Sequence, residues 1–313
     1  MGRARGVFGL QLLVALAGMA TTFLMFALVA GSITLGGSDR QTLLEACERF
    51  ALPHVTVLNA LVLAAGSVAF AVLTLGVRSA LRQVRASRRF FSNLQLLRPL
   101  PLGPPGTMLF AGERPQAFCA GLLRPRIYVS EGTLGLLERA ELDAVLAHEA
   151  HHARYRDPLR IFFTRTLSDA LFFLPVLRHL SERYAALAEL AADAAAVRRS
   201  GHDPAPLASA LLAFDGAVSP AVVGIAPERI DHLLGERIRW ELPVALLAWT
   251  LAIVAAVLVV ALRLDDATAH TTVDLPLLAS QLCMLAMAVV PLLFGAGTLI
   301  GSGRLFRRRL AVR

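Results

Sequence analysis

The stretch AVLAHEAHHARYRDP, residues 144–158, concentrates ionisable side chains in the middle of a chain that is 56% hydrophobic. His148 and His152 are four residues apart, so on a helix both imidazoles lie on one face and can bind the same metal ion. Glu149 lies beside this pair. The pattern H-E-x-x-H therefore predicts a zinc site in which Glu149 does not bind the metal but takes a proton from water. His151 points away from that face and is not expected to bind the metal.

The residues around this motif predict a folded domain with both helices and strands, from 107 to 241. A proline-rich linker, residues 97–106, precedes it. The segments TMLFAG and QAFCAGLLRPRIYVS are typical of short strands, and a helix is expected from 138 to about 156. Asp157 followed by Pro158 is expected to cap the next helix. Two short helices are expected at 207–214 and 227–238.

Zinc needs a third protein ligand, which must come from another helix. Glu189 is the best candidate, because alanines surround it and allow its helix to approach closely. Asp193 lies one turn further along the same face and is placed to accept a hydrogen bond from a ligand imidazole. Glu182 is the second choice of ligand. The alternative is that Glu189 is an ordinary surface carboxylate.

Four long stretches contain no charged residue, and each has the roughly 20 apolar residues that a transmembrane helix requires. They are residues 6–38, 50–77, 242–262 and 275–303. The first is much longer than the core of a signal peptide, so we expect it to remain as an anchor. We therefore predict two spans with an arginine-rich juxtamembrane segment in residues 1–96, and two more with an arginine-rich tail in residues 242–313.

One further apolar segment, residues 159–177, is harder to assign. It carries Arg160, Arg165 and Asp169, and three charges argue against a fifth span. An amphipathic helix at the membrane surface, or one that covers the domain core, fits the pattern better. Pro175 is expected to bend or restart this helix.

Arginines set the orientation of the spans. Clusters follow the second and fourth spans, whereas the loops at 36–53 and 263–274 balance their arginines with acidic residues. By the positive-inside rule, both termini and the region 78–241 face the cytoplasm, with the lipid bilayer as a partner. The net charge of +8 is then mostly a topology signal. We expect no nucleic-acid binding, because no aromatic-rich basic patch accompanies the arginines.

The segment HEAHHARYRDPL followed by ELAAD resembles the gluzincin metallopeptidases, and most closely the BlaR/MecR-type integral membrane metallopeptidases. The CAAX prenyl protease/HtpX-type membrane proteases are similar as well. The segment AFCAGLLRPRIYVSEGTL resembles the strand region of these families, so the likeness covers about residues 107–240.

The resemblance implies a role for each matching position. His148, His152 and Glu189 match the ligands of one zinc ion per chain, Glu149 the general base, and Asp193 the carboxylate behind a ligand. The stretch QAFCAG matches an edge strand that pairs with an extended protein or peptide substrate, through Ala117, Phe118, Cys119, Ala120 and Gly121. The sensor members carry a large extracellular penicillin-binding domain, which the short outer loops here cannot hold, so antibiotic sensing is not expected.

We therefore expect a mainly α membrane protein, in a bacterial inner membrane, with four transmembrane helices and a cytoplasmic α+β zinc peptidase domain. Its expected activity is zinc-dependent endopeptidase cleavage in regulatory or quality-control proteolysis, with Arg154 or Arg156 as a candidate cation at the oxyanion. An intramembrane site-two-type protease is disfavoured by the charges that flank the motif. A non-catalytic scaffold or signalling subunit with a structural zinc ion is the other alternative, but it has no use for Glu149.

The topology can be tested by labelling single cysteines from outside intact cells. Cysteines at Ser38 and Thr268 should react with an impermeant reagent, because both loops are predicted to lie outside. Cysteines at Ser130 and Ser302 should react only after lysis. External labelling at Ser130 would invert the topology and place the domain in the other compartment.

Overall fold

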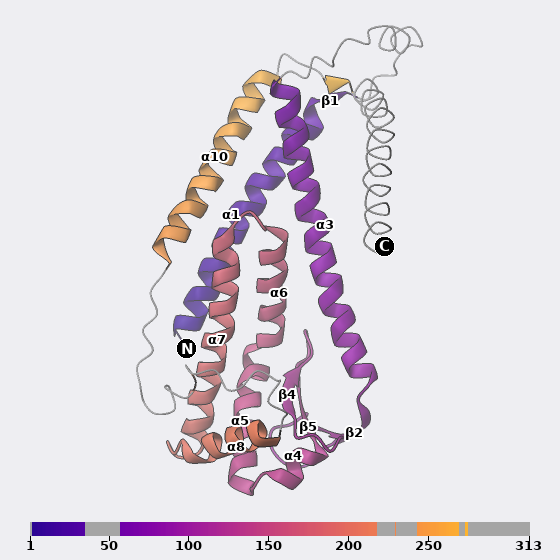
Figure 1. Ribbon diagram of the computed structural model, residues 1–313, viewed down its shortest axis with the longest axis vertical. Helices are drawn as coiled ribbons and strands as arrows, with labels where there is room; N and C mark the ends of the chain where they lie inside the picture. Colours follow the sequence, from indigo (N-terminus) through magenta and orange to yellow (C-terminus); the bar gives the residue numbers. More distant parts are fainter. Residues whose placement is uncertain (1, 35–56, 218–228, 230–242, 269–272, 275–313) are drawn as a thin grey trace, which may run out of the picture. The chain divides into compact units, whose positions relative to one another are not determined.

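The computed structural model describes residues 2–34, 57–217, 229, 243–268 and 273–274, and Figure 1 shows their helices and strands. The chain divides into two compact units. The first comprises Met1–Thr21 and Phe70–Val257, and the second comprises Thr22–Ala69 and Leu258–Arg313. In the second unit, β1 (Ile33–Thr34) and β6 (Val273–Asp274) form a short parallel pair. All residues of the candidate site lie in the first unit.

Among the described residues, two helices are long and apolar enough to cross a membrane. They are α1 (Gly2–Ser32), with the candidate span Gly2–Ala27, and α3 (Val57–Ser92), with the candidate span Ala64–Ser92. Large apolar side chains such as Phe23 and Phe70 are exposed on them, as expected of a surface that faces lipid.

The other two expected spans have less support among the described residues. The third coincides with α10 (Val244–Thr268), whose apolar part, Val244–Val260, is shorter. The fourth, residues 275–303, lies outside the described residues. The total of four spans therefore stays a prediction.

A small mixed sheet opens the domain. Its order is β2-β3-β5-β4, in which β3 and β5 are parallel and the other pairs are antiparallel. The strands are β2 (Gln95–Pro99), β3 (Met108–Ala111), β4 (Ala117–Ala120) and β5 (Arg126–Ser130). The expected linker at 97–106 therefore begins inside a strand, where Pro99 is tolerated because β2 lies at an edge of the sheet. Strand β4 lies at the edge, so one side of its backbone is unpaired within the sheet.

Helices form the rest of the domain. They are α4 (Glu131–Leu136), α5 (Arg139–Tyr155), α6 (Asp157–Ala170), α7 (Pro175–Arg199) and α8 (Ala205–Ala217). Glu138 and Glu141 form a capping box at the start of α5, and prolines stand in the first turns of α6 and α7. The expected helix at 207–214 is thus confirmed as α8, whereas the one at 227–238 lies outside the described residues apart from Arg229.

The α6–α7 hairpin packs against the first unit's parts of α1 and α3. Leu171, Leu174, Leu177 and Leu180 are fully buried there, in one core cluster with Val7, Val14, Ala15 and Val72. The Gln11 amide on α1 donates to the carbonyl oxygens of Thr164 and Leu177, at 3.1 and 3.3 Å. The apolar segment 159–177 therefore contributes to the core, as one of its two readings expected.

A buried polar cluster fixes the start of β4. Ser130 caps α4, and its Oγ accepts from the backbone N–H of Gln116 at 2.9 Å and donates to the carbonyl of Arg114 at 2.8 Å. The N–H of Gly132 donates to the carbonyl of Gly112 at 2.8 Å. A Cβ atom at Gly132 would collide with the carbonyl oxygen of Glu113. This close approach ties α4 to the loop that leads into the edge strand.

We therefore expect Gly132→Ala to destabilise the fold by about 1–3 kcal/mol, because backbone atoms must move to admit the methyl group. Gly135→Ala is the matched control, since it lies in the same helix and a Cβ atom there meets nothing within 4 Å. The control should change stability by less than about 1 kcal/mol, in the stabilising direction. Thermal unfolding in detergent measures both. Equal melting temperatures for the two variants would contradict the tight contact.

Candidate metal centre

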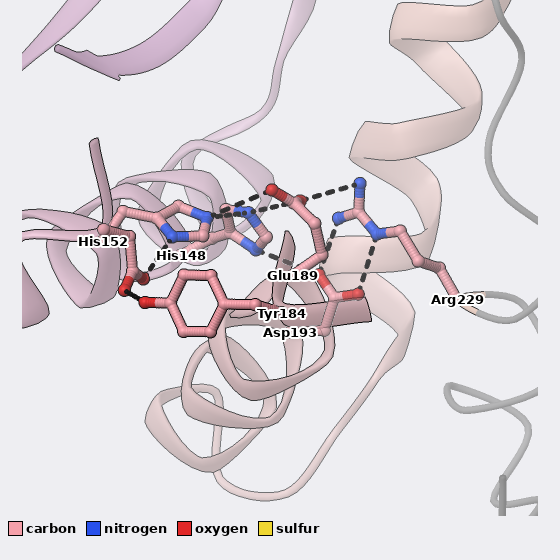
Figure 2. A network of polar contacts seen from close by, with 7 residues as sticks. His148, His152, Tyr184, Glu189, Asp193 and Arg229 are labelled. Atoms are coloured by element: carbon pink, nitrogen blue, oxygen red, sulfur yellow. Dashed lines mark hydrogen bonds and ion pairs between the residues drawn. The ribbon is translucent and has the colours of Figure 1, made fainter. Parts of the chain in front are cut away.

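Helix α5 presents His148 and His152 on one face, as their spacing predicts, and both side chains are buried. Their Nε2 atoms lie 3.2 Å apart (Figure 2). Tetrahedral zinc with Zn–N bonds of about 2.0–2.1 Å separates its ligand atoms by roughly 3.3 Å. The two imidazoles therefore already have the spacing of two ligands on one ion.

A carboxylate stands behind each imidazole. Nδ1 of His152 lies 2.8 Å from Oδ2 of Asp157. Nδ1 of His148 lies 2.9 Å from Oδ1 of Asp193, without the alignment of a straight hydrogen bond. Both contacts favour a proton on Nδ1, which leaves the Nε2 lone pairs facing each other. Two facing lone pairs repel, so the arrangement calls for a proton or a metal ion between them.

Glu189 on α7 completes the group. Its Oε2 lies 3.5 Å from Nε2 of His148, and its Oε1 lies 3.5 Å from Nε2 of His152. The donor atoms of the three residues all lie within 4.8 Å of one another. Burial lowers the pKa of His148, but the contacts with Asp193 and Glu189 more than reverse this and raise it to about 9. The surroundings thus favour positive charge between the rings, which a divalent ion would supply.

The structure places Glu189 beside the histidines, and not Glu182, the second choice of ligand. Glu182 accepts from Arg178 at 3.1 Å on the exposed side of α7, away from the histidines. His151 is buried, and its ring packs against Tyr155 with centroids 4.6 Å apart. It is not part of the three-residue group.

Glu149 lines a cavity that His148, His152 and Glu189 also line, but it is not one of the three residues whose donor atoms converge. It is only 9% exposed. Burial raises the pKa of Glu149 above its ordinary value, and the neighbouring imidazoles of His148 and His152 oppose the shift without cancelling it. A carboxylate with increased proton affinity, next to a metal position, is what a general base requires.

Asp157 has a different part from the helix cap that the sequence favours. Arg156, in the left-handed conformation with φ of 52°, joins α5 directly to α6. This corner turns the Asp157 carboxylate inward, where it contacts His152 and accepts from the Tyr184 hydroxyl at 2.7 Å. Burial raises the pKa of Asp157, but the hydrogen bonds from His152 and Tyr184 outweigh it and lower the pKa below its ordinary value. From the sequence, a role of Asp157 in the site was possible but a helix cap was favoured, and nothing indicated Tyr184.

Arg229 was also missed. Its Nε and Nη2 donate to Oδ2 and Oδ1 of Asp193 at 2.9 and 2.6 Å, and its Nη1 lies 3.4 Å from Oε2 of Glu189 (Figure 2). Burial raises the pKa of Asp193, but its contacts with His148 and Arg229 lower it to about 2. Arg229 lines the site cavity, which neither Arg154 nor Arg156 does. No local pattern in the sequence marks this one arginine among the others.

The cavity over the histidines has a volume of about 440 Å³. Edge strand β4 contributes Ala117, Phe118 and Cys119 to its lining, and α8 contributes the apolar Leu207 and Leu211. Ala120 and Gly121, which were also expected to contact substrate, are outside this lining. Burial, followed by the charges of Glu149 and Asp157, raises the pKa of the Cys119 thiol to about 12, so it stays protonated. Cys119 is therefore a small neutral strand residue.

Comparison with known proteins agrees with this geometry. Residues 113–240, which include all the residues of the candidate site, match the family described as BlaR1 peptidase M56. A stretch of 72 residues is 40% identical to a Protease HtpX homolog from Acidiphilium cryptum (strain JF-5). The chain resembles membrane zinc metallopeptidases of these two kinds. The HtpX match spans 22% of this chain and only 25% of that relative's length.

Metal content tests the geometry directly. Purified protein should hold about one zinc ion per chain, and His148→Ala, His152→Ala or Glu189→Ala should remove most of it, because a tetrahedral site loses one of three protein ligands. Glu182→Ala is the matched control on the same helix and should keep its zinc. Elemental analysis of the folded variants measures the ratio. Full zinc in the Glu189→Ala protein would rule out Glu189 as a ligand.

Proposed function

We propose that the chain is a membrane-bound zinc endopeptidase that hydrolyses peptide bonds on the cytoplasmic side of the membrane, in regulatory or quality-control proteolysis. One arrangement of residues is the main support for this proposal. The Nε2 atoms of His148 and His152 lie 3.2 Å apart and Glu189 lies beside them. The buried Glu149 and the edge strand β4 line the same cavity. The similarity to membrane metallopeptidases supports the reaction class.

Glu149 provides the proton transfers of the proposed reaction. His148, His152 and Glu189 would hold a zinc ion, which when bound would polarise the substrate carbonyl and lower the pKa of water. Glu149 accepts the proton of the attacking water and returns it to the leaving amine. Burial of Glu149 serves both steps, because it raises the pKa of the carboxyl group toward neutral pH.

The edge strand β4 provides the proposed means of binding substrate. An extended peptide can add to the free side of Ala117–Ala120 by main-chain hydrogen bonds, which do not depend on the peptide's sequence. The lining residues Leu207, Leu211 and Phe214 then offer an apolar surface to one of its side chains. This favours an unfolded or extended segment as substrate, since a folded one does not present a free strand.

Asp157, Asp193 and Arg229 act as positioning residues. The two aspartates fix the orientation of the imidazoles, and Arg229 holds both Asp193 and Glu189. Such groups behind metal ligands typically change metal affinity or activity 10–100-fold when removed. Arg229 also brings a positive charge to the cavity, where Arg154 or Arg156 was expected from the sequence.

The scaffold alternative explains the cavity less well. Structural zinc sites are usually closed by four protein ligands, whereas catalytic sites keep one position open. Here three residues form the metal group, and it borders a cavity of about 440 Å³. A scaffold also gains nothing from burying Glu149, which costs free energy when the carboxylate is charged.

Substitution of Glu149 by glutamine distinguishes an endopeptidase from a non-catalytic scaffold. Glu149→Gln keeps the size of the side chain but cannot accept the proton of water. It should retain zinc and fold, and lose cleavage by about 10²–10⁴-fold or more. The assay uses an unfolded model protein in detergent, with a chelator-treated wild type as its baseline and Glu182→Gln as the control variant. Equal, chelator-sensitive cleavage by wild type and Glu149→Gln would show that the mechanism is wrong.

A further inference from the structure

The turn between α6 and α7, residues 170–175, packs against a glycine on each of the two long apolar helices. A Cβ atom at Gly18 of α1 would lie 2.7 Å from Cδ1 of Leu174, and one at Gly76 of α3 would lie 3.2 Å from Cβ of Ala170. Leu171 and Leu174 are buried in this contact. The turn is therefore closely fitted between two helices that can cross a membrane.

Charged groups begin directly beside this turn. Asp169 accepts from Ser79 at 2.6 Å and from Arg82 at 3.2 Å, and about half of its side chain is exposed. Arg178, on the first turn of α7, has 83% of its side chain exposed. Exposed charges of this kind are costly in hydrocarbon. The hydrocarbon must therefore end at or before the level of Asp169 and Arg178.

The turn itself carries no charge. Its sequence is ALFFLP, and Phe172 points outward with 53% of its surface exposed. In α3 the uncharged part from Val57 to Gly76 has 20 residues, the length that a span needs, and α1 continues without a charge from Gly18 to its end at Ser32. The turn therefore lies at the level where the uncharged part of α3 would enter a bilayer.

We propose that residues 170–175 form a membrane-docking surface, which inserts at the boundary between headgroups and acyl chains with Phe172 in contact with lipid. The hairpin does not cross the membrane, because its charges stop it at this depth. Its partner is the bilayer itself. Phe and Leu side chains are typical of the apolar face that an interfacial segment buries at the boundary between headgroups and acyl chains.

Docking of this turn would also fix the distance of the metal centre from the membrane. Glu189 lies fourteen residues after Pro175 on the same helix, α7. At about 1.5 Å per residue, the backbone of Glu189 lies about 21 Å along the helix axis from Pro175. A rigid helix anchored at one end thus holds the metal centre close to the membrane.

Spin labels can measure the depth directly in the full chain. The native cysteines are replaced (Cys47→Ser, Cys119→Ala, Cys283→Ala), and a single label is placed by Phe172→Cys or by its control, Arg178→Cys. Both sites are exposed, so labelling should not disturb the core. In vesicles of phosphatidylethanolamine and phosphatidylglycerol, the label at 172 should collide mainly with oxygen, which concentrates in lipid. The label at 178 should collide mainly with a water-soluble nickel complex.

The proposal is overturned if the label at 172 meets nickel as readily as the label at 178, which would place the turn in water. It is also overturned if both labels prefer oxygen, which would mean that the hairpin spans the bilayer. If Phe172→Cys does not fold, Phe172→Trp in a chain lacking Trp240 and Trp249 should be quenched by brominated lipids, and absence of quenching counts against docking. None of these readouts needs cleavage or zinc, so failure here is separate from failure of the proposed function.

Discussion

The need for positive charge between two facing imidazole nitrogens is the constraint on which the candidate site depends. Nε2 of His148 and Nε2 of His152 lie 3.2 Å apart, and the surrounding carboxylates favour a proton or a metal ion between the rings. Three helices are needed for this, since α5 supplies the rings, α6 supplies Asp157 and α7 supplies Asp193. The packing of α6 and α7 can therefore be understood as the support of one electrostatic arrangement, which a divalent cation relieves.

Acidic groups outnumber basic ones around the metal position. Glu149, Asp157, Glu189 and Asp193 bring four carboxyl groups, against the guanidinium of Arg229 and the imidazole of His148, whose pKa is raised, among the described residues. Buried carboxylates cost free energy unless they are paired or bind a metal. Asp157 and Asp193 meet this cost with hydrogen bonds from Tyr184 and Arg229. Glu149 has no comparable ion pair among the described residues, and this leaves its proton affinity raised.

Local patterns were enough to predict part of this site. Helical spacing places His148 and His152 on one face, and the alanines around Glu189 allow α7 to come close, so both features could be read from the sequence. The positions of Asp157, Tyr184 and Arg229 could not. Asp157 depends on a left-handed residue, Arg156, that joins two helices without a loop. Arg229 depends on a contact with a residue 36 positions away.

The fold shows the same division. Apolar runs long enough for a bilayer predict α1 and α3, because that property is local. Strand β2 was taken for a linker, because proline-rich composition hides a strand that forms only by pairing with β3. The segment 159–177 has charges that argue against a transmembrane span and leucines that argue against exposure to water. Its contacts with α1 and α3 show that the leucines are buried inside the protein.

The order of the site's residues along the chain has a consequence for biosynthesis. His148, His152 and Glu189 come together when α7 folds back on α5, and α1, which the hairpin packs against, is made first. Arg229 is made later, 36 residues after Asp193. During synthesis, the metal ligands can therefore meet before the guanidinium that steadies them exists. The order of synthesis thus allows metal loading to precede completion of the domain.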